Sequence, residues 1–101
     1  MQEKRQHPRV PISLDLKCEI ADAAGILGTA GDISLGGLFV QTEVTPPAFG
    51  TNLTIVTRLP GLSGEVRLPA IVRWNKAGGF GVQFQLLGAR ETHAITDLMR
   101  H

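Results

Sequence analysis

Apolar and polar residues alternate along most of this chain with the two-residue period of a half-buried β-strand. In residues 13–20 every second side chain is apolar, and the side chains between them at positions 15, 17 and 19 are charged. The apolar members of later alternating segments are Leu38 and Val40; Leu53, Ile55 and Leu59; Val66, Leu68, Ala70 and Val72; and Phe80, Val82, Phe84 and Leu86. Because successive side chains of a strand point to opposite faces, each segment can cover one side of a common core.

Turn signals separate these segments, at Ala23-Ala24-Gly25, Gly36-Gly37, Pro46-Pro47, Pro60-Gly61, Ser63-Gly64 and Ala77-Gly78-Gly79. Short strands with hairpin-sized connections favour an antiparallel barrel or sandwich over a parallel α/β sheet. The helical pattern comes last, with Ile95, Leu98 and Met99 at helical spacing after Gly88. A helix of about 10 residues is marginal in water by itself, so we expect this one to pack its apolar stripe on the strands.

Composition agrees with one small domain. The chain has 101 residues, of which 43% are apolar and 19% charged, with a net charge of +1. It is too hydrophobic for a disordered tail and not basic enough for a general nucleic-acid binder. No apolar run approaches the roughly 20 residues that span a bilayer, and no signal peptide follows the first residues, so we expect a cytoplasmic protein without membrane insertion. Cys18 is the sole cysteine and is expected in the core, between Leu16 and Ile20.

The candidate chemistry lies in Asp32-Ile33-Ser34-Leu35-Gly36-Gly37 and in two N-terminal arginines. A short strand with Ile33 in the core presents Asp32 and Ser34 side by side on its outer face. The two glycines permit a sharp turn and let a flat group approach the backbone. The same residues also suit ordinary turn chemistry, since Asp and Ser side chains readily bond nearby amides.

Arg5 and Arg9 stand four residues apart, with Pro8 between them to keep the segment extended. Their planar guanidinium groups match phosphate and the edges of bases. Together with the Asp32 and Ser34 acceptors, they point to a nucleotide receptor.

These two motifs carry a family resemblance. Arg-x-x-x-Arg followed by Asp-x-Ser-x-x-Gly resembles the signature of PilZ domains, and it is completed here by Arg5 and Arg9 and then by Asp32, Ser34 and Gly37. Val72-Arg73-Trp74 and the segment 79–84 also fit, so the resemblance covers nearly the whole chain. It implies an all-β dominated fold: a small antiparallel β-barrel of about six strands over residues 13–86, a C-terminal α-helix at 89–100 and a flexible ligand-binding arm at 1–9, all in one domain.

The resemblance further implies that the ligand is the bacterial second messenger cyclic di-GMP. Arg5 and Arg9 would clamp a phosphate and the guanine Hoogsteen edge, and Asp32 would accept hydrogen bonds from guanine N–H groups. Ser34 would add a polar contact, and the backbone of Gly36 and Gly37 would leave room for the ring.

Three further residues are candidates for the same site. Lys4 either extends the cationic cluster or is ordinary surface charge; in similar proteins a cation here goes with two intercalated ligands, so we expect two per chain. Trp74 shares strand parity with Val72, which favours a core position, yet in similar proteins an aromatic or arginine near this point meets a guanine face. Arg73 is a candidate on the same ground.

The sequence gives little support for catalysis. Asp32 occupies the place of the first glycine in a Gly-x-Ser-x-Gly nucleophile elbow. His7, His93 and His101 lack metal-ligand spacing. The stretch Gly79-Phe80-Gly81 lacks the downstream glycine of a dinucleotide fold. We therefore expect a receptor that is not an enzyme and has no cofactor or metal.

Ordering of the arm on binding would create a surface for a downstream protein in motility, polysaccharide or regulatory machinery. The alternatives are a ligand-independent PilZ-like adaptor, whose members usually lack the arginines, and a barrel that binds single-stranded nucleic acid. A barrel that binds single-stranded nucleic acid needs a basic groove with exposed aromatic side chains. This chain has one Trp and four Phe, and most of the Phe residues fall at positions that alternate into the core.

Overall fold

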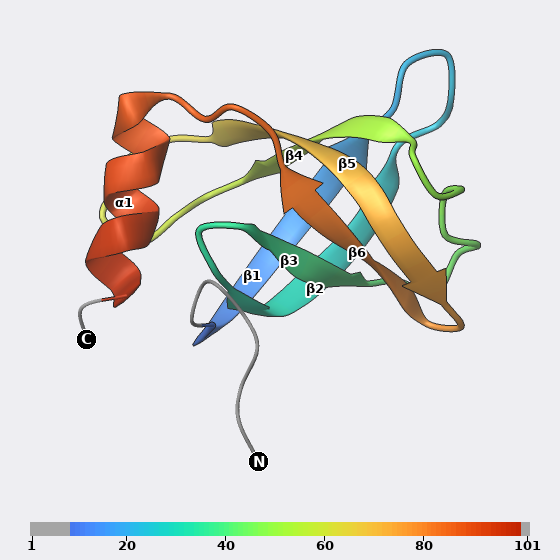
Figure 1. Ribbon diagram of the computed structural model, residues 1–101, viewed down its shortest axis with the longest axis horizontal. Coiled ribbons are helices and arrows are strands. Elements are labelled where there is room, and N and C mark those ends of the chain that lie inside the picture. The colour runs from blue at the N-terminus through green and yellow to red at the C-terminus, as the bar shows by residue number, and fades with distance from the viewer. Residues whose placement is uncertain (1–8, 100–101) are drawn as a thin grey trace.

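The computed structural model describes residues 9–99 and shows a closed antiparallel barrel with one helix (Figure 1). The elements are β1 (Val10–Glu19), β2 (Ile26–Ile33), β3 (Gly37–Gln41), β4 (Asn52–Thr57), β5 (Val66–Lys76), β6 (Gly79–Phe84) and α1 (Ala89–Met99). Around the barrel the strand order is β1-β2-β3-β6-β5-β4, and β4 pairs with β1 to close it. The predicted fold class, a six-stranded antiparallel barrel with a short C-terminal helix, is confirmed.

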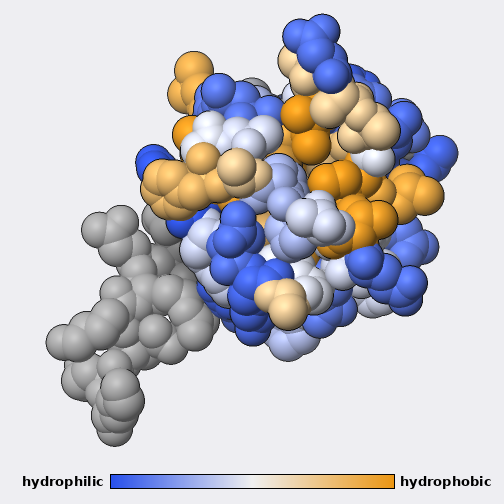
Figure 2. All heavy atoms as spheres, turned by 90° about the vertical axis from the view of Figure 1, so that its right-hand side faces the viewer, coloured by the Kyte–Doolittle hydropathy of each residue, from blue (hydrophilic) through white to orange (hydrophobic). Residues whose placement is uncertain are grey.

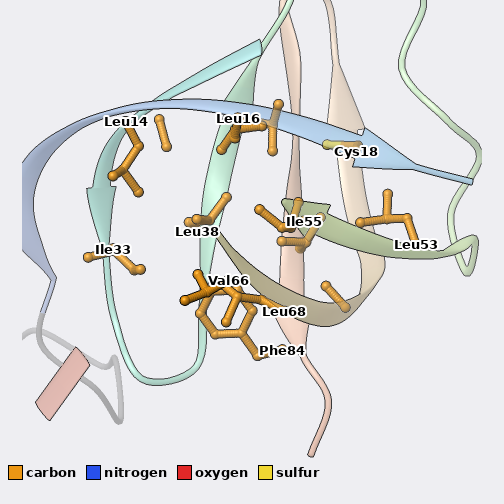
Figure 3. Close-up of a cluster of buried hydrophobic side chains, with 14 of the residues drawn as sticks. Leu14, Leu16, Cys18, Ile33, Leu38, Leu53, Ile55, Val66, Leu68 and Phe84 are labelled. Carbon is orange, nitrogen blue, oxygen red and sulfur yellow. The ribbon is translucent and has the colours of Figure 1, made fainter. Parts of the chain in front are cut away.

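One face of every strand supplies the core. Figure 3 shows these apolar side chains converging inside the barrel. The alternation predicted for residues 13–20 holds from Leu14 to Cys18, whose thiol is fully buried. The strand itself starts earlier, at Val10, because Val10 and Pro11 pair with Ile33 and Asp32 of β2. The ladder thereby brings the residues after Arg9 against the Asp32 motif.

The alternation predicted from the sequence extends two residues beyond the observed end of β6. Leu86, predicted to continue the apolar face of β6, is 92% exposed. The strand ends at Phe84, and the amide of Gln85 donates instead to the carbonyl of Pro69. Once the ladder ends, the two-residue alternation no longer places side chains.

Helix α1 covers one end of the barrel, away from the β5–β6 hairpin (Figure 1). Ala94 and Ile95 are buried, and Leu98 and Met99 are partly buried against the core. A short helix is stabilised mainly by such packing. None of the residues that line the candidate site, which lies in the barrel wall, belongs to α1.

Within residues 9–99, no helix is long and apolar enough to cross a membrane. Most of the predicted arm, including Lys4 and Arg5, lies outside the described residues.

Candidate functional site

The β2–β3 turn is built around the Ser34 hydroxyl. Its Oγ accepts hydrogen bonds from the amides of Gly36 at 3.1 Å and Gly37 at 3.2 Å. The Ser34 amide donates to the Gly37 carbonyl at 2.9 Å. The prediction that Ser34 faces outward beside Asp32 is wrong, because β2 ends at Ile33 and Ser34 is only 8% exposed. Its hydroxyl fixes the shape of the turn.

This turn lies directly against β6. A Cβ on Gly37 would collide with the Val82 carbonyl oxygen, so no other residue fits without moving the strands. The Phe84 amide also donates to the Gly36 carbonyl at 2.8 Å. Gly37, one of the two glycines predicted to let a flat group approach, thus first allows β3 and β6 to approach each other.

Asp32 and Arg9 meet at the edge of the turn. Arg9 Nη1 lies 3.7 Å from Asp32 Oδ2, and both side chains are more than a third exposed. The other oxygen, Oδ1, is buried and has no hydrogen-bond partner among residues 9–99. An unsatisfied buried acceptor costs roughly 1–3 kcal/mol.

A β-bulge in β5 turns Trp74 outward. Val72 pairs with Val82 and Trp74 with Gly81, which leaves Arg73 as the extra, unpaired residue. A bulge of this kind shifts the alternation of side chains by one position. Trp74 is consequently 45% exposed, and the core position that its parity favoured is wrong. Arg73 is exposed too, and its Nε donates to Gln83 Oε1 at 2.7 Å.

These features surround one hollow in the barrel wall, of about 220 Å³. It is lined by Arg9, Ser34, Gly36, Gly37, Leu38, Phe39, Arg73, Trp74, Gly81, Val82 and Gln83. Asp32 adjoins it through Arg9. A hollow of this size suits one planar ring, because whole small-molecule sites occupy roughly 300–1,000 Å³.

Sequence reasoning missed Phe39 and Gln83. Phe39 lies between the buried Leu38 and Val40, so its parity alone places an aromatic ring on the outer face of β3. The alternation in the sequence therefore contained a signal for an exposed ring at Phe39. Gln83 has no sequence signal, because only the strand register brings it to Arg73.

A larger hollow, of about 980 Å³, lies at the end of the barrel where the start of β2, the end of β3 with the residues that follow it, and the β5–β6 hairpin meet. Figure 2 faces this end, where apolar residues are exposed among polar ones. Leu27 and Val44 line the hollow and are 75% and 53% exposed. Its charged lining is Glu43 and Lys76, so it lacks the paired cations that a phosphate ligand needs. The smaller hollow is therefore the better candidate.

Among the described residues, no three His, Cys, Asp or Glu side chains gather where they could hold a metal ion. His93 is exposed on α1.

The fold is that of a small closed β-barrel domain, and the hollow in its wall is the candidate binding site. The profile of the PilZ domain matches residues 3–101, and the chain belongs to this family. No curated protein matches the sequence directly.

Solved structures agree on the fold. The inhibitor of motility MotI/DgrA from Bacillus subtilis has 20% identity and a TM-score of 0.75, over 98% of this chain and 51% of that one. The PilZ domain of CeSA from a cellulose-synthesizing bacterium has 22% identity and a TM-score of 0.73, over 93% and 99%. The PilZ domain of Escherichia coli YcgR, solved with c-di-GMP, has 19% identity and a TM-score of 0.71, over 97% and 93%. The chain thus spans about half of MotI/DgrA and nearly all of the isolated domains.

Proposed function

We propose that this chain is a non-catalytic receptor for cyclic di-GMP that changes conformation on binding and so regulates a partner protein. The observation that carries the proposal is the hollow in which Arg9, Arg73 and Trp74 meet the β2–β3 turn. Membership of the PilZ family and the E. coli YcgR domain solved with c-di-GMP support it.

The chemistry of the hollow suits a guanine with its phosphate. The exposed ring of Trp74 offers a stacking face, and the guanidinium groups of Arg9 and Arg73 offer donors for phosphate and the Hoogsteen edge. The Asp32 carboxylate, whose Oδ2 lies beside Arg9, offers an acceptor for guanine N–H. Ser34 acts through the turn that it holds.

Arg5 and Lys4 are proposed to add phosphate contacts from the N-terminal arm. Closure of this arm over the ligand would form the surface that a downstream motility, polysaccharide or regulatory protein reads. We place this role in the cytoplasm, as the sequence predicts.

The test is calorimetric titration with cyclic di-GMP, GTP, cyclic GMP and a short single-stranded oligonucleotide. We expect binding of cyclic di-GMP in preference to the others, and an affinity about tenfold to a hundredfold lower in Arg9→Ala and Asp32→Ala. A hydrogen bond to a charged group contributes roughly 1.5–3 kcal/mol, which sets this range. Arg58→Ala is the matched control, because Arg58 is exposed and does not line the hollow.

Wild-type protein that shows no heat of binding at high micromolar ligand would contradict the receptor function and favour the ligand-independent adaptor. Preferred binding of the oligonucleotide would favour the nucleic-acid barrel. The same titration gives the stoichiometry, for which we expect two ligands per chain, falling in Lys4→Ala.

A further inference from the structure

An aromatic stack lies on the outer wall of the barrel, where its two rings, Phe39 and Trp74, line the hollow. The rings of Phe39 on β3 and Trp74 on β5 are stacked, with centroids 5.1 Å apart and planes at 24°. Lys76 Nζ lies 5.3 Å from the Phe39 centroid and 5.8 Å from that of Trp74. We call these three residues the aromatic stack.

The two rings come from strands that are not neighbours, because β6 runs between β3 and β5. They meet above two glycines of β6, Gly79 and Gly81. A Cβ on Gly79 would lie 2.7 Å from Phe39 Cε2, and one on Gly81 would lie 2.6 Å from Trp74 Cε2. Both glycines are buried, although Phe80 and Val82 occupy the inner positions of this strand. The rings therefore take the space of the missing side chains.

This arrangement gives Trp74 little freedom. Phe39 stacks against the ring, and the ring packs into the space left by the absent side chain of Gly81. The bulge at Arg73 orients Trp74 outward. Offset stacking and a nearby cation both favour such a packed ring. Fixing a side chain before binding removes part of the entropy cost of binding.

We propose that Phe39 and Gly81 are positioning residues that hold Trp74 as a preformed stacking surface for a purine ring in the hollow. The proposal rests on the proposed receptor function for its ligand, whereas the held state of the Trp74 ring can be measured without any ligand. The proposal also gives a structural role to Gly79-Phe80-Gly81 of β6, a stretch that lacks the downstream glycine of a dinucleotide-binding motif.

The ligand-free test uses fluorescence, because Trp74 is the sole tryptophan of the chain. We expect Phe39→Leu and Gly81→Ala to raise acrylamide quenching of Trp74 and lower its anisotropy. Phe39→Tyr keeps a stacking ring and should behave as wild type. Gly31→Ala is the matched control for Gly81→Ala, because a Cβ there meets nothing within 4 Å.

The second test is calorimetry with cyclic di-GMP. Stacking of a base on an aromatic side chain predicts an affinity about 5- to 150-fold lower in Trp74→Ala. Phe39→Leu and Gly81→Ala should lose part of this, about three- to tenfold, since the ring remains but is no longer held. Phe39→Tyr and Gly31→Ala should bind as wild type.

Ile95→Val is the control for a general loss of stability, because it alters the buried face of α1 and not the surroundings of Trp74. It should lower the melting temperature without changing the quenching of Trp74. If melting shows that Gly81→Ala does not fold, the pair Phe39→Leu and Phe39→Tyr decides.

Wild-type binding combined with unchanged affinity and quenching in Phe39→Leu would overturn the positioning role and leave the receptor function standing. Unchanged affinity in Trp74→Ala would overturn the stacking surface itself. Wild-type protein that binds no cyclic di-GMP would overturn the receptor function and, with it, the purine ligand of this surface.

Discussion

At the scale of single residues, burial has opposite effects on stability at Asp32 and at Cys18. Asp32 keeps one oxygen beside Arg9 and buries the other without a partner in the described part of the chain, an arrangement that costs stability. Cys18 is fully buried among apolar side chains, where its neutral thiol is well accommodated. Burial therefore costs stability at Asp32 and suits the apolar core at Cys18.

Burial raises the pKa of the Cys18 thiol from 9.0 to about 12. Between these two values the thiol ionises in the unfolded chain but stays protonated in the folded one, so the unfolded state binds fewer protons. The free energy of unfolding should therefore fall as pH rises from 9 to 12, by about 1.4 kcal/mol per pH unit. Urea denaturation of wild type and Cys18→Ala at a series of pH values measures the effect.

The Cys18→Ala variant is the control, because other groups that titrate in this range are common to both proteins. Its stability deficit relative to wild type should shrink as the pH rises. Parallel pH curves for the two proteins would show that burial does not hold the thiol neutral.

At the scale of elements, the candidate site depends on irregularities of the barrel. The β2–β3 turn brings Ser34 and the glycines against β6, and the bulge at Arg73 turns Trp74 outward. Regular strands would have sent Trp74 into the core. The hollow thus lies where β5 and the β2–β3 turn depart from ideal geometry, as is common for bulges next to sites.

Ser34→Ala tests the turn directly. It leaves the amides of Gly36 and Gly37 without their acceptor, so the free energy of unfolding in urea should fall by about 1–3 kcal/mol. Ser13→Ala, at an exposed position of β1, should change it by less than about 0.5 kcal/mol. Equal stability of both variants would mean that the hydroxyl does not hold the turn.

At the scale of the whole molecule, the barrel is a closed and packed support. All six strands are paired around the ring, and α1 covers one end (Figure 1). The hollow lies in the wall formed by β3, β6 and β5, near the start of β1. A change on binding is therefore expected in the chain leading to Val10 rather than in the barrel.

We predict that amide relaxation rates of residues 1–9 change when cyclic di-GMP is added, while those of residues 13–86 stay nearly constant. The first nine residues have no apolar side chain after Met1, so burial offers them little, whereas ligand phosphates would anchor Arg5 and Arg9. Ordering this segment would reduce the binding free energy. Rates in residues 1–9 that are the same with and without saturating ligand would contradict the switch.

The amino-acid sequence by itself determined the fold class and the core, because alternation over a strand such as residues 13–20 depends only on local geometry and burial. The spacing of its two motifs also pointed to the PilZ family. Tertiary structure decided the side-chain directions at the site. Trp74 faces out because β5 gains one residue against β6, and Ser34 turns inward because β2 ends before it. Phe39 reaches Trp74 only because β6 places Gly79 and Gly81 beneath both rings. These outcomes depend on the pairing of distant strands, which no local pattern of residues records.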